Sequence, residues 1–387
     1  MLDDGTGSIC SVLLPLKSYL LTAYRPKNIN SWLRREPAAT TLPSMATGIM
    51  PITHRGVNQL PLTASTRYLR RILISAGVLP SIDVYRNDLD VYATHFLADL
   101  PAEHAAILKR FYRWHILPTI RRRLAGKEMT IGMYKNWRTE LRNHRRLLQW
   151  LAQHGFTLAT AHQSAIDRYV AEHPPTHSTG VFLNWATTAG LCTKLTAVVV
   201  DQHHARPRLS DTDLTTIVDE VFNASTMPLP ARLVALFAVI YAQPIQRSAA
   251  LRRSSVRDNG AGNLVIAFAQ TPIRLPDTLE RLVREQLNNL DQSHQTLPGG
   301  QDWLFPGVMP DQHVSPGRTR DIIAEAGFNV RLLKDSRLQH FAQTIPASII
   351  ADVTGISVEQ ATKHSRNAGG TWAGYPASRQ GPPNLRE

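Results

Sequence analysis

The chain has 387 residues, 43% of them hydrophobic, so it is long enough for two or three domains with buried cores. Its formal net charge is +13, and arginine, which binds phosphate through a planar fork of N–H donors, supplies 35 of the 43 basic residues, so the composition favours a nucleic-acid partner. No apolar run approaches the roughly 20 residues of a membrane-spanning helix, and the two cysteines, Cys10 and Cys192, exclude a disulfide framework or a zinc site built from four cysteines.

Residues 1–95 are predicted to form an N-terminal helical accessory region. Residues 9–21 are apolar, but Asp3 and Asp4 precede them where a secretion signal needs positive charge, so an N-terminal helix is expected. A second helix is expected over 66–77. The region is interpreted either as an accessory domain for DNA contact or assembly, or as scaffold. We expect a cytoplasmic, nucleoid-associated protein with no membrane contact.

Residues 96–195 are predicted to form an all-helical domain. The expected helices cover 102–124, 130–154, 163–173 and 178–190, with glycines and prolines between them. In the first helix the apolar spacing predicts a core face made of Ile107, Leu108, Phe111, Trp114 and Leu117.

The polar faces of the first two helices in this domain are strongly cationic. Residues 101–150 hold twelve Lys or Arg against three acids. The cations proposed to bind double-stranded DNA are Arg121, Arg122, Arg123, Lys135, Arg138, Arg142, Arg145 and Arg146. Most of the later ones follow a spacing of three to four, which gathers like charges on one face where an anion would neutralise them. The alternative is a solvated basic surface.

A linker is expected over 196–212, followed by a second domain over 213–387. The pair His203 and His204 lacks a third ligand at metal-binding spacing, so no metal is expected. No cofactor is expected for this chain. Ser210–Asp213 has the form of a capping box that opens a helix.

A buried helix is predicted over Leu233–Tyr241, and Arg247 follows it. Asp258–Gly262 is a turn signal beside Val256 and the alternating segment Leu264–Phe268. A second short strand is expected over 272–276. The fold class is therefore mainly α with a small β-hairpin.

Arg331–Ser357 reads as two helices separated by Pro346 and ended by Gly355. Arg331, Lys334 and Arg337 lie within two turns and form a cationic edge suited to phosphate, or else a solvated face of a core helix.

Several of these residues resemble the motifs of the tyrosine recombinase (phage integrase) family. Arg331-Leu-Leu-Lys334 is similar to the family's His-x-x-Arg, Phe341-Ala342 to its Phe-Ala pair, and Thr354-Gly355-Ile356 to its Leu-Gly-His. Arg247, placed after a buried helix, resembles the first arginine of the family. The resemblance implies a helical core-binding domain followed by a catalytic domain that cleaves and rejoins DNA through a phosphotyrosyl intermediate.

The same resemblance implies roles for individual residues. Arg247, Arg331 and Lys334 would stabilise the scissile phosphate, and Tyr375 would be the nucleophile, unless it anchors the C-terminal segment to the core. The family's hairpin lysine is missing, because no lysine lies between Lys194 and Lys334. Counting ten residues from Gly355 reaches Ser365, not a tyrosine.

Three functions are therefore open. The first is a DNA-binding protein that resembles a site-specific tyrosine recombinase and self-associates on DNA. The second is a recombinase-like binder with no catalysis and an architectural or regulatory role. The third is a helical protein-interaction module.

Overall fold

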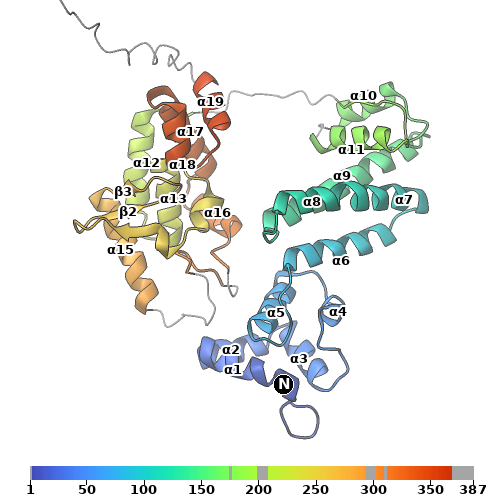
Figure 1. Ribbon diagram of the computed structural model, residues 1–387, viewed down its shortest axis with the longest axis horizontal. Coiled ribbons are helices and arrows are strands. Elements are labelled where there is room, and N and C mark those ends of the chain that lie inside the picture. Colours follow the sequence, from blue (N-terminus) through green and yellow to red (C-terminus); the bar gives the residue numbers. More distant parts are fainter. Residues whose placement is uncertain (1, 174–176, 198–207, 293–301, 309–311, 368–387) are drawn as a thin grey trace, which may run out of the picture. The chain divides into compact units, whose positions relative to one another are not determined.

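The computed structural model describes residues 2–173, 177–197, 208–292, 302–308 and 312–367. It is mainly helical with one small antiparallel sheet, as the sequence predicts (Figure 1). The chain divides into two compact units, Met1–Leu21 with Arg25–His204, and Thr22–Tyr24 with Ala205–Glu387. Within the described ranges, no helix has the length and apolar character needed to cross a membrane.

The first unit begins with short helices: η1 (Ser11–Leu13), α1 (Leu14–Ala23), α2 (Pro26–Leu33), α3 (Ala38–Ala46), α4 (His54–Val57) and α5 (Ala64–Ser75). The arginines of α5 contact other side chains of the same unit. Arg67 pairs with Asp88 at 3.2 Å, and Arg70 is fully buried and donates to Asn58 Oδ1 at 2.6 Å. Arg71 lies over the ring of Tyr85.

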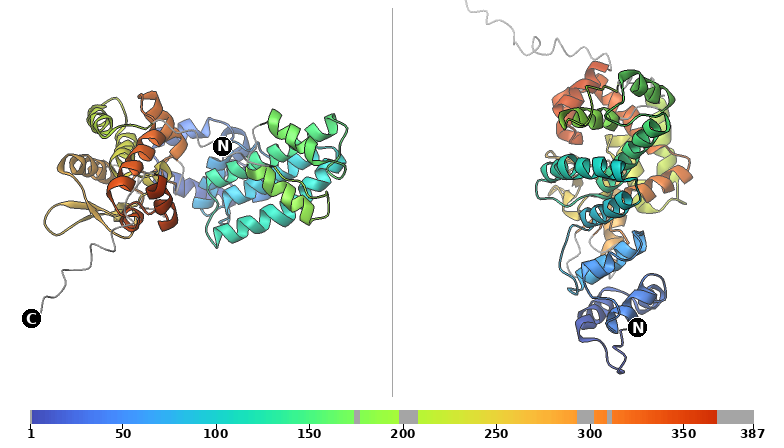
Figure 2. Two further views of the ribbon diagram at one scale, coloured as in Figure 1. Left: turned by 90° about the horizontal axis from the view of Figure 1, so that it is seen from above. Right: turned by 90° about the vertical axis from the view of Figure 1, so that its right-hand side faces the viewer.

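The remaining helices of this unit are α6 (Val84–Ala98), α7 (Ala102–Phe111), α8 (Leu117–Leu124), α9 (Ile131–Gln153), α10 (Gln163–Glu172) and α11 (His177–Thr188). The long helix α9 packs against α6, α7, α10 and α11, and Figure 2 shows these helices gathered as a bundle. The helix α6 continues across residue 95, where the sequence places the boundary between the accessory region and the next domain. That boundary remains a prediction.

The helix expected over 102–124 contains a π-helical turn, η2 (Tyr112–Ile116), where the N–H of Leu117 donates to the carbonyl of Tyr112. Pro118 has no N–H to donate to the carbonyl of Trp114, which favours such a widened turn. The predicted core position of Trp114 is wrong, because this side chain is 68% exposed while Ile116 is buried.

The second unit contains α12 (Asp211–Asn223), α13 (Leu229–Tyr241), α14 (Ile245–Ala249), η3 (Arg253–Ser255), α15 (Asp277–Gln292), α16 (Pro316–Glu325), α17 (Val330–Thr344), α18 (Ala347–Thr354) and α19 (Val358–Asn367). The predicted capping box is present at the start of α12. The apolar helix α13 is the centre of this unit and packs against α12, α14, α15, α16 and α17 (Figure 1).

The sheet is antiparallel in the order β1 (Val256–Asp258), β2 (Leu264–Ile266) and β3 (Ile273–Arg274), so the predicted hairpin is confirmed. Val256 pairs with Ile266, and Ile266 pairs with Ile273. The buried side chain of Ile266 faces the core that surrounds α13.

The stretch with which the family resemblance is strongest forms α17 and α18. Figure 2 shows α17, α18 and α19, coloured orange to red, grouped at one side of this unit. Gly355 ends α18 in the left-handed conformation at φ +71°, as predicted for a capping glycine. On α18, Ile350 is buried, but Ile349 is 48% exposed, so the predicted apolar stripe is narrower than expected.

Candidate phosphate-binding site

Arg247 lies on α14, directly after the central helix α13. Its Nη1 donates to the carbonyl oxygen of Thr354, and its Nη2 donates to that of Gly355 at 2.9 Å. The last carbonyls of a helix have no partner within the helix, so a cation there is favourable. Arg247 thus caps the C-terminus of α18, a helix that lies more than 100 residues later in the sequence.

Gly355 leaves room for this guanidinium. A Cβ at position 355 would fall on the guanidinium of Arg247 and lie 3.2 Å from the Cβ of Ala269. Ala269 belongs to the connection between β2 and β3. The structure therefore brings together Arg247, the end of α18 and the hairpin loop, three segments that the sequence resemblance links.

Uncharged polar groups surround the backbone of this site. Gln243 is fully buried and donates to the carbonyls of Tyr241 at 3.3 Å and Thr354 at 3.5 Å. Gln243 Oε1, Ser248 Oγ and the Tyr241 hydroxyl are buried without a hydrogen-bond partner in the described part of the chain. Burial raises the pKa of Tyr241 to about 12, so its hydroxyl stays protonated.

Arg331 and Lys334 share a single acid. Lys334 Nζ lies 2.6 Å from Asp335 Oδ1, and Arg331 Nε lies 3.8 Å from Asp335 Oδ2. Arg331 is 72% exposed, whereas Lys334 and Asp335 are each 25% exposed. The three side chains carry a net charge of +1, so a phosphate here competes with Asp335 for both cations.

Arg337, proposed for DNA contact, is held inside the second unit. Its Nε donates to the carbonyl of Val239 at 2.7 Å, and its Nη1 pairs with Asp211 at 3.1 Å. Only 17% of this side chain is exposed. Its role in DNA contact stays a prediction.

The helix α19 packs against α17 and carries a histidine, His364, directly before Ser365. Burial lowers the pKa of His364, the Lys334 ammonium lowers it further, and the Asp335 carboxylate opposes them. His364 is thus on a helix that packs against α17, which carries Lys334 and Asp335. Ser365 Oγ is buried with no hydrogen-bond partner among the described residues. Tyr375 lies outside the described residues.

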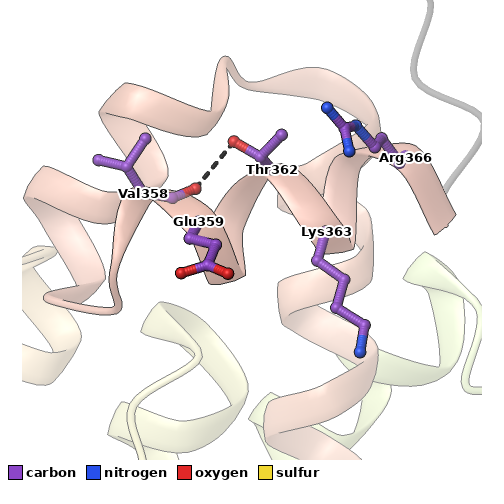
Figure 3. A pocket seen from close by; sticks show the side chains of 5 residues that line it. All are labelled: Val358, Glu359, Thr362, Lys363 and Arg366. Atoms are coloured by element: carbon purple, nitrogen blue, oxygen red, sulfur yellow. Dashed lines mark hydrogen bonds between the residues drawn. The ribbon is translucent and has the colours of Figure 1, made fainter.

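The outer side of α19 borders an open pocket lined by Val358, Glu359, Thr362, Lys363 and Arg366. Figure 3 shows Lys363 and Arg366 pointing away from each other, so they do not converge on one anion. Within the described ranges, no group of three His, Cys, Asp or Glu side chains is arranged to hold a metal ion.

The cations proposed on α8 and α9 fall into two groups. Arg121, Arg122, Arg123, Lys135, Arg142 and Arg146 are exposed. Arg138 and Arg145 are half-buried: the Arg138 guanidinium lies 4.4 Å from the Tyr92 ring centroid, and that of Arg145 lies 5.7 Å from the Phe96 ring centroid.

Sequence reasoning missed the partners of the candidate residues. Arg247, expected to bind phosphate, donates instead to the carbonyls of Thr354 and Gly355. Lys334, expected to do the same, pairs with the carboxylate of Asp335. A signal existed for the carbonyls, because the end of a helix at a capping glycine leaves acceptors that need donors.

No protein-family model matches the sequence, and no curated protein does. Among solved structures, XerH site-specific recombinase bound to palindromic difH substrate is 11% identical, with 75% of this chain and 96% of that chain covered and a TM-score of 0.44. Lambda integrase bound to DNA is 14% identical, with 66% of this chain and 96% of that chain covered and a TM-score of 0.40. XerA recombinase is 12% identical, with 71% of this chain and 98% of that chain covered and a TM-score of 0.33.

Proposed function

We propose that this chain binds duplex DNA through the cationic face of α8 and α9, in the manner of a recombinase-like DNA-binding protein. The observation that carries the proposal is that six of the expected cations on α8 and α9 are exposed, namely Arg121, Arg122, Arg123, Lys135, Arg142 and Arg146. Exposed like charges repel one another unless an anion neutralises them, and the phosphates of DNA are such an anion. Bidentate N–H geometry makes arginine well suited to that contact.

In the full form of the proposal, the second unit contacts the phosphate at which strands are exchanged. Arg247, Arg331 and Lys334 stabilise charge on the phosphate oxygens while Tyr375 attacks phosphorus. The new bond is a 3′-phosphotyrosyl link, the bond that breaks joins phosphorus to the 5′ oxygen of the next nucleotide, and that oxygen leaves as a hydroxyl with a proton to replace the one that the tyrosine gives up. The copies of the chain self-associate on DNA. Arg247 can act only if its fork is released from the end of α18, or through the N–H groups that the two carbonyls leave free.

A salt titration of DNA binding tests the proposal. The test variant replaces Arg121, Arg122 and Arg123 with glutamine. The control replaces Arg168, Arg318 and Arg320, which are ion-paired with acids at 3.0 to 3.2 Å, so that both variants have the same net charge. Fluorescence anisotropy with a labelled duplex gives the affinity at each salt concentration.

We expect the test variant to reduce the slope of log K against log salt by about 2 to 3, since each phosphate contact contributes about 0.9. The control should retain the slope of the native chain to within about 1. Equal slopes in both variants would show that only net charge matters, and a native chain with no affinity at low salt would exclude DNA binding.

A second candidate keeps DNA binding and lacks strand cleavage. Two observations support it. Both terminal nitrogens of Arg247 already donate hydrogen bonds to backbone carbonyls, and the sequence has no lysine between Lys194 and Lys334. Removing one preorganised donor from an active site costs about 10²- to 10³-fold in rate. On this basis the chain would hold DNA in an architectural or regulatory complex.

A nicked suicide substrate separates the two candidates. An active recombinase forms a covalent DNA adduct that survives denaturation and disappears in Tyr375→Phe. The non-cleaving candidate forms no adduct on DNA from the native locus while retaining its salt-dependent affinity.

A further inference from the structure

Trp114 is a large aromatic side chain in an exposed position on the first unit. It is 68% exposed, and the guanidinium carbon of Arg113 lies 5.7 Å from its ring centroid. An exposed tryptophan loses the stabilisation that burial of its ring would give. A contact with a ligand would recover that area.

The π-helical turn explains why this side chain faces solvent. Among the buried positions of α7, η2 and α8, one row recurs every four residues, at Leu108, Tyr112, Ile116 and Ile120. A regular helix has 3.6 residues a turn, so a spacing of four would drift around its surface. The wider turn at Tyr112–Ile116 absorbs the difference and keeps these residues on the core, which leaves Trp114 on the outer face.

The sequence around Trp114 is cationic. Arg110 and Arg113 precede it, Arg121 and Arg122 follow it on α8, and all four of these side chains are exposed. Between Glu103 and Glu128 the sequence has seven Lys or Arg and no acid. Charge complementarity therefore favours the binding of a polyanion over that of a neutral ligand or a protein surface with few acidic residues.

We propose that Trp114 stacks on a nucleic-acid base that is unpaired or exposed at a distorted step, while the flanking arginines hold the adjacent phosphates. Stacking on an aromatic ring tolerates any base, because every base has a π face. Arg113, already against the indole ring, brings a cation to the same point. The inference rests on the proposed DNA binding and adds a preference for DNA that is not fully paired.

The test compares a labelled duplex with the same duplex carrying a short unpaired stretch. The variants are Trp114→Ala, Trp114→Phe, and Arg113→Gln, with Ile49→Ala as a control because Ile49 is 81% exposed on another part of the chain. Circular dichroism melting checks that each variant is folded. Affinity is measured by anisotropy over a range of salt concentrations.

We expect Trp114→Ala to lower affinity for the DNA with the unpaired stretch by about tenfold and to leave the salt slope unchanged, since no phosphate contact is lost. Trp114→Phe should keep most of the affinity, and Arg113→Gln should reduce the slope by about 0.7 to 0.9.

Native affinity for both DNAs in Trp114→Ala would overturn the inference and leave the proposed DNA binding intact. A changed oligomeric state with unchanged DNA affinity would also overturn it and would assign the tryptophan to a protein contact. If the native chain binds neither DNA, the proposed function itself is wrong.

Discussion

The guanidinium of Arg247 donates hydrogen bonds to the carbonyls of Thr354 and Gly355, which lie 107 and 108 positions later in the sequence. A hydrogen bond to a charged group contributes about 1.5 to 3 kcal/mol. At the scale of the residue, the side chain that most resembles a phosphate ligand therefore also stabilises the fold. The stabilising role can be tested by changing Gly355, which lies against the guanidinium and carries no charge.

We predict that Gly355→Ala destabilises the second unit in two ways. The left-handed φ of +71° costs an alanine roughly 1 to 2 kcal/mol, and the new Cβ displaces Arg247 from the end of α18. Gly327→Ala is the control, since Gly327 has φ +92° and nothing within 4 Å of an added Cβ. Urea unfolding should show a larger loss for Gly355→Ala. Equal losses would mean that the contact with Arg247 contributes no stability.

His144 in the first unit gives a prediction about pH. Its side chain is 1% exposed, stacks on Phe182 with ring centroids 4.5 Å apart, and has no hydrogen-bond partner at Nε2 in the described part of the chain. Burial, with a smaller contribution from His115, lowers its pKa from 6.5 to about 3. The folded state thus binds fewer protons than the unfolded state, so stability is full above pH 6.5 and falls as the pH drops toward 3.

We therefore expect His144→Phe to flatten the fall in unfolding free energy between pH 6.5 and 4. For the native chain this residue contributes at most about 1.4 kcal/mol for each pH unit in that window. Urea unfolding at a series of pH values measures the slope. His95→Phe, at an exposed position, is the control. Parallel curves for native and His144→Phe proteins would contradict the assignment.

At the scale of the element, α9 carries two arginines one turn apart with different environments. Arg138 lies 4.4 Å from the Tyr92 ring centroid and donates to the Tyr134 hydroxyl at 3.3 Å, whereas Arg142 is exposed. A partly desolvated cation over an aromatic ring contributes about 1 to 2 kcal/mol. A surface cation contributes little to stability.

We predict that Arg138→Gln lowers the unfolding free energy by about 1 to 2 kcal/mol with little change in the salt dependence of DNA binding. Arg142→Gln should change stability by less than about 0.5 kcal/mol and reduce the salt slope by about 0.9. Denaturant unfolding and salt titration on the same two proteins provide both measurements. The reverse pattern would assign Arg138 to the DNA contact.

The elements also show what the sequence could and could not predict. The capping box at Ser210 and the hairpin turn at Asp258–Gly262 depend on neighbouring residues, and both were predicted correctly. The apolar spacing misplaces Trp114, because the regular helical period breaks before Pro118, where the turn is π-helical. The chemistry of Arg247 marks it as a phosphate ligand, but its partners at the end of α18 are set by tertiary packing that local patterns do not encode.

At the scale of the whole molecule, the two units have separate hydrophobic cores. Phe111 belongs to the core around α9, and Phe237 belongs to the core around α13; both side chains are fully buried. Proteins with several compact units often unfold in more than one step. The cores therefore predict two thermal transitions in calorimetry, one for each unit.

Phe111→Ala and Phe237→Ala form a matched pair for this prediction, since each removes the same atoms from a different core. A buried Phe→Ala change costs about 3 to 5 kcal/mol, which should lower one transition clearly and leave the other in place. A single transition lowered by both variants would contradict independent units.

Once each transition is assigned to a unit, the same calorimetry can be repeated with duplex DNA, because a ligand raises the stability of the unit that binds it. If DNA is held by both the α8–α9 face and the site at Arg247, both transitions should rise, whereas binding by the first unit alone should raise only the transition that Phe111→Ala lowers.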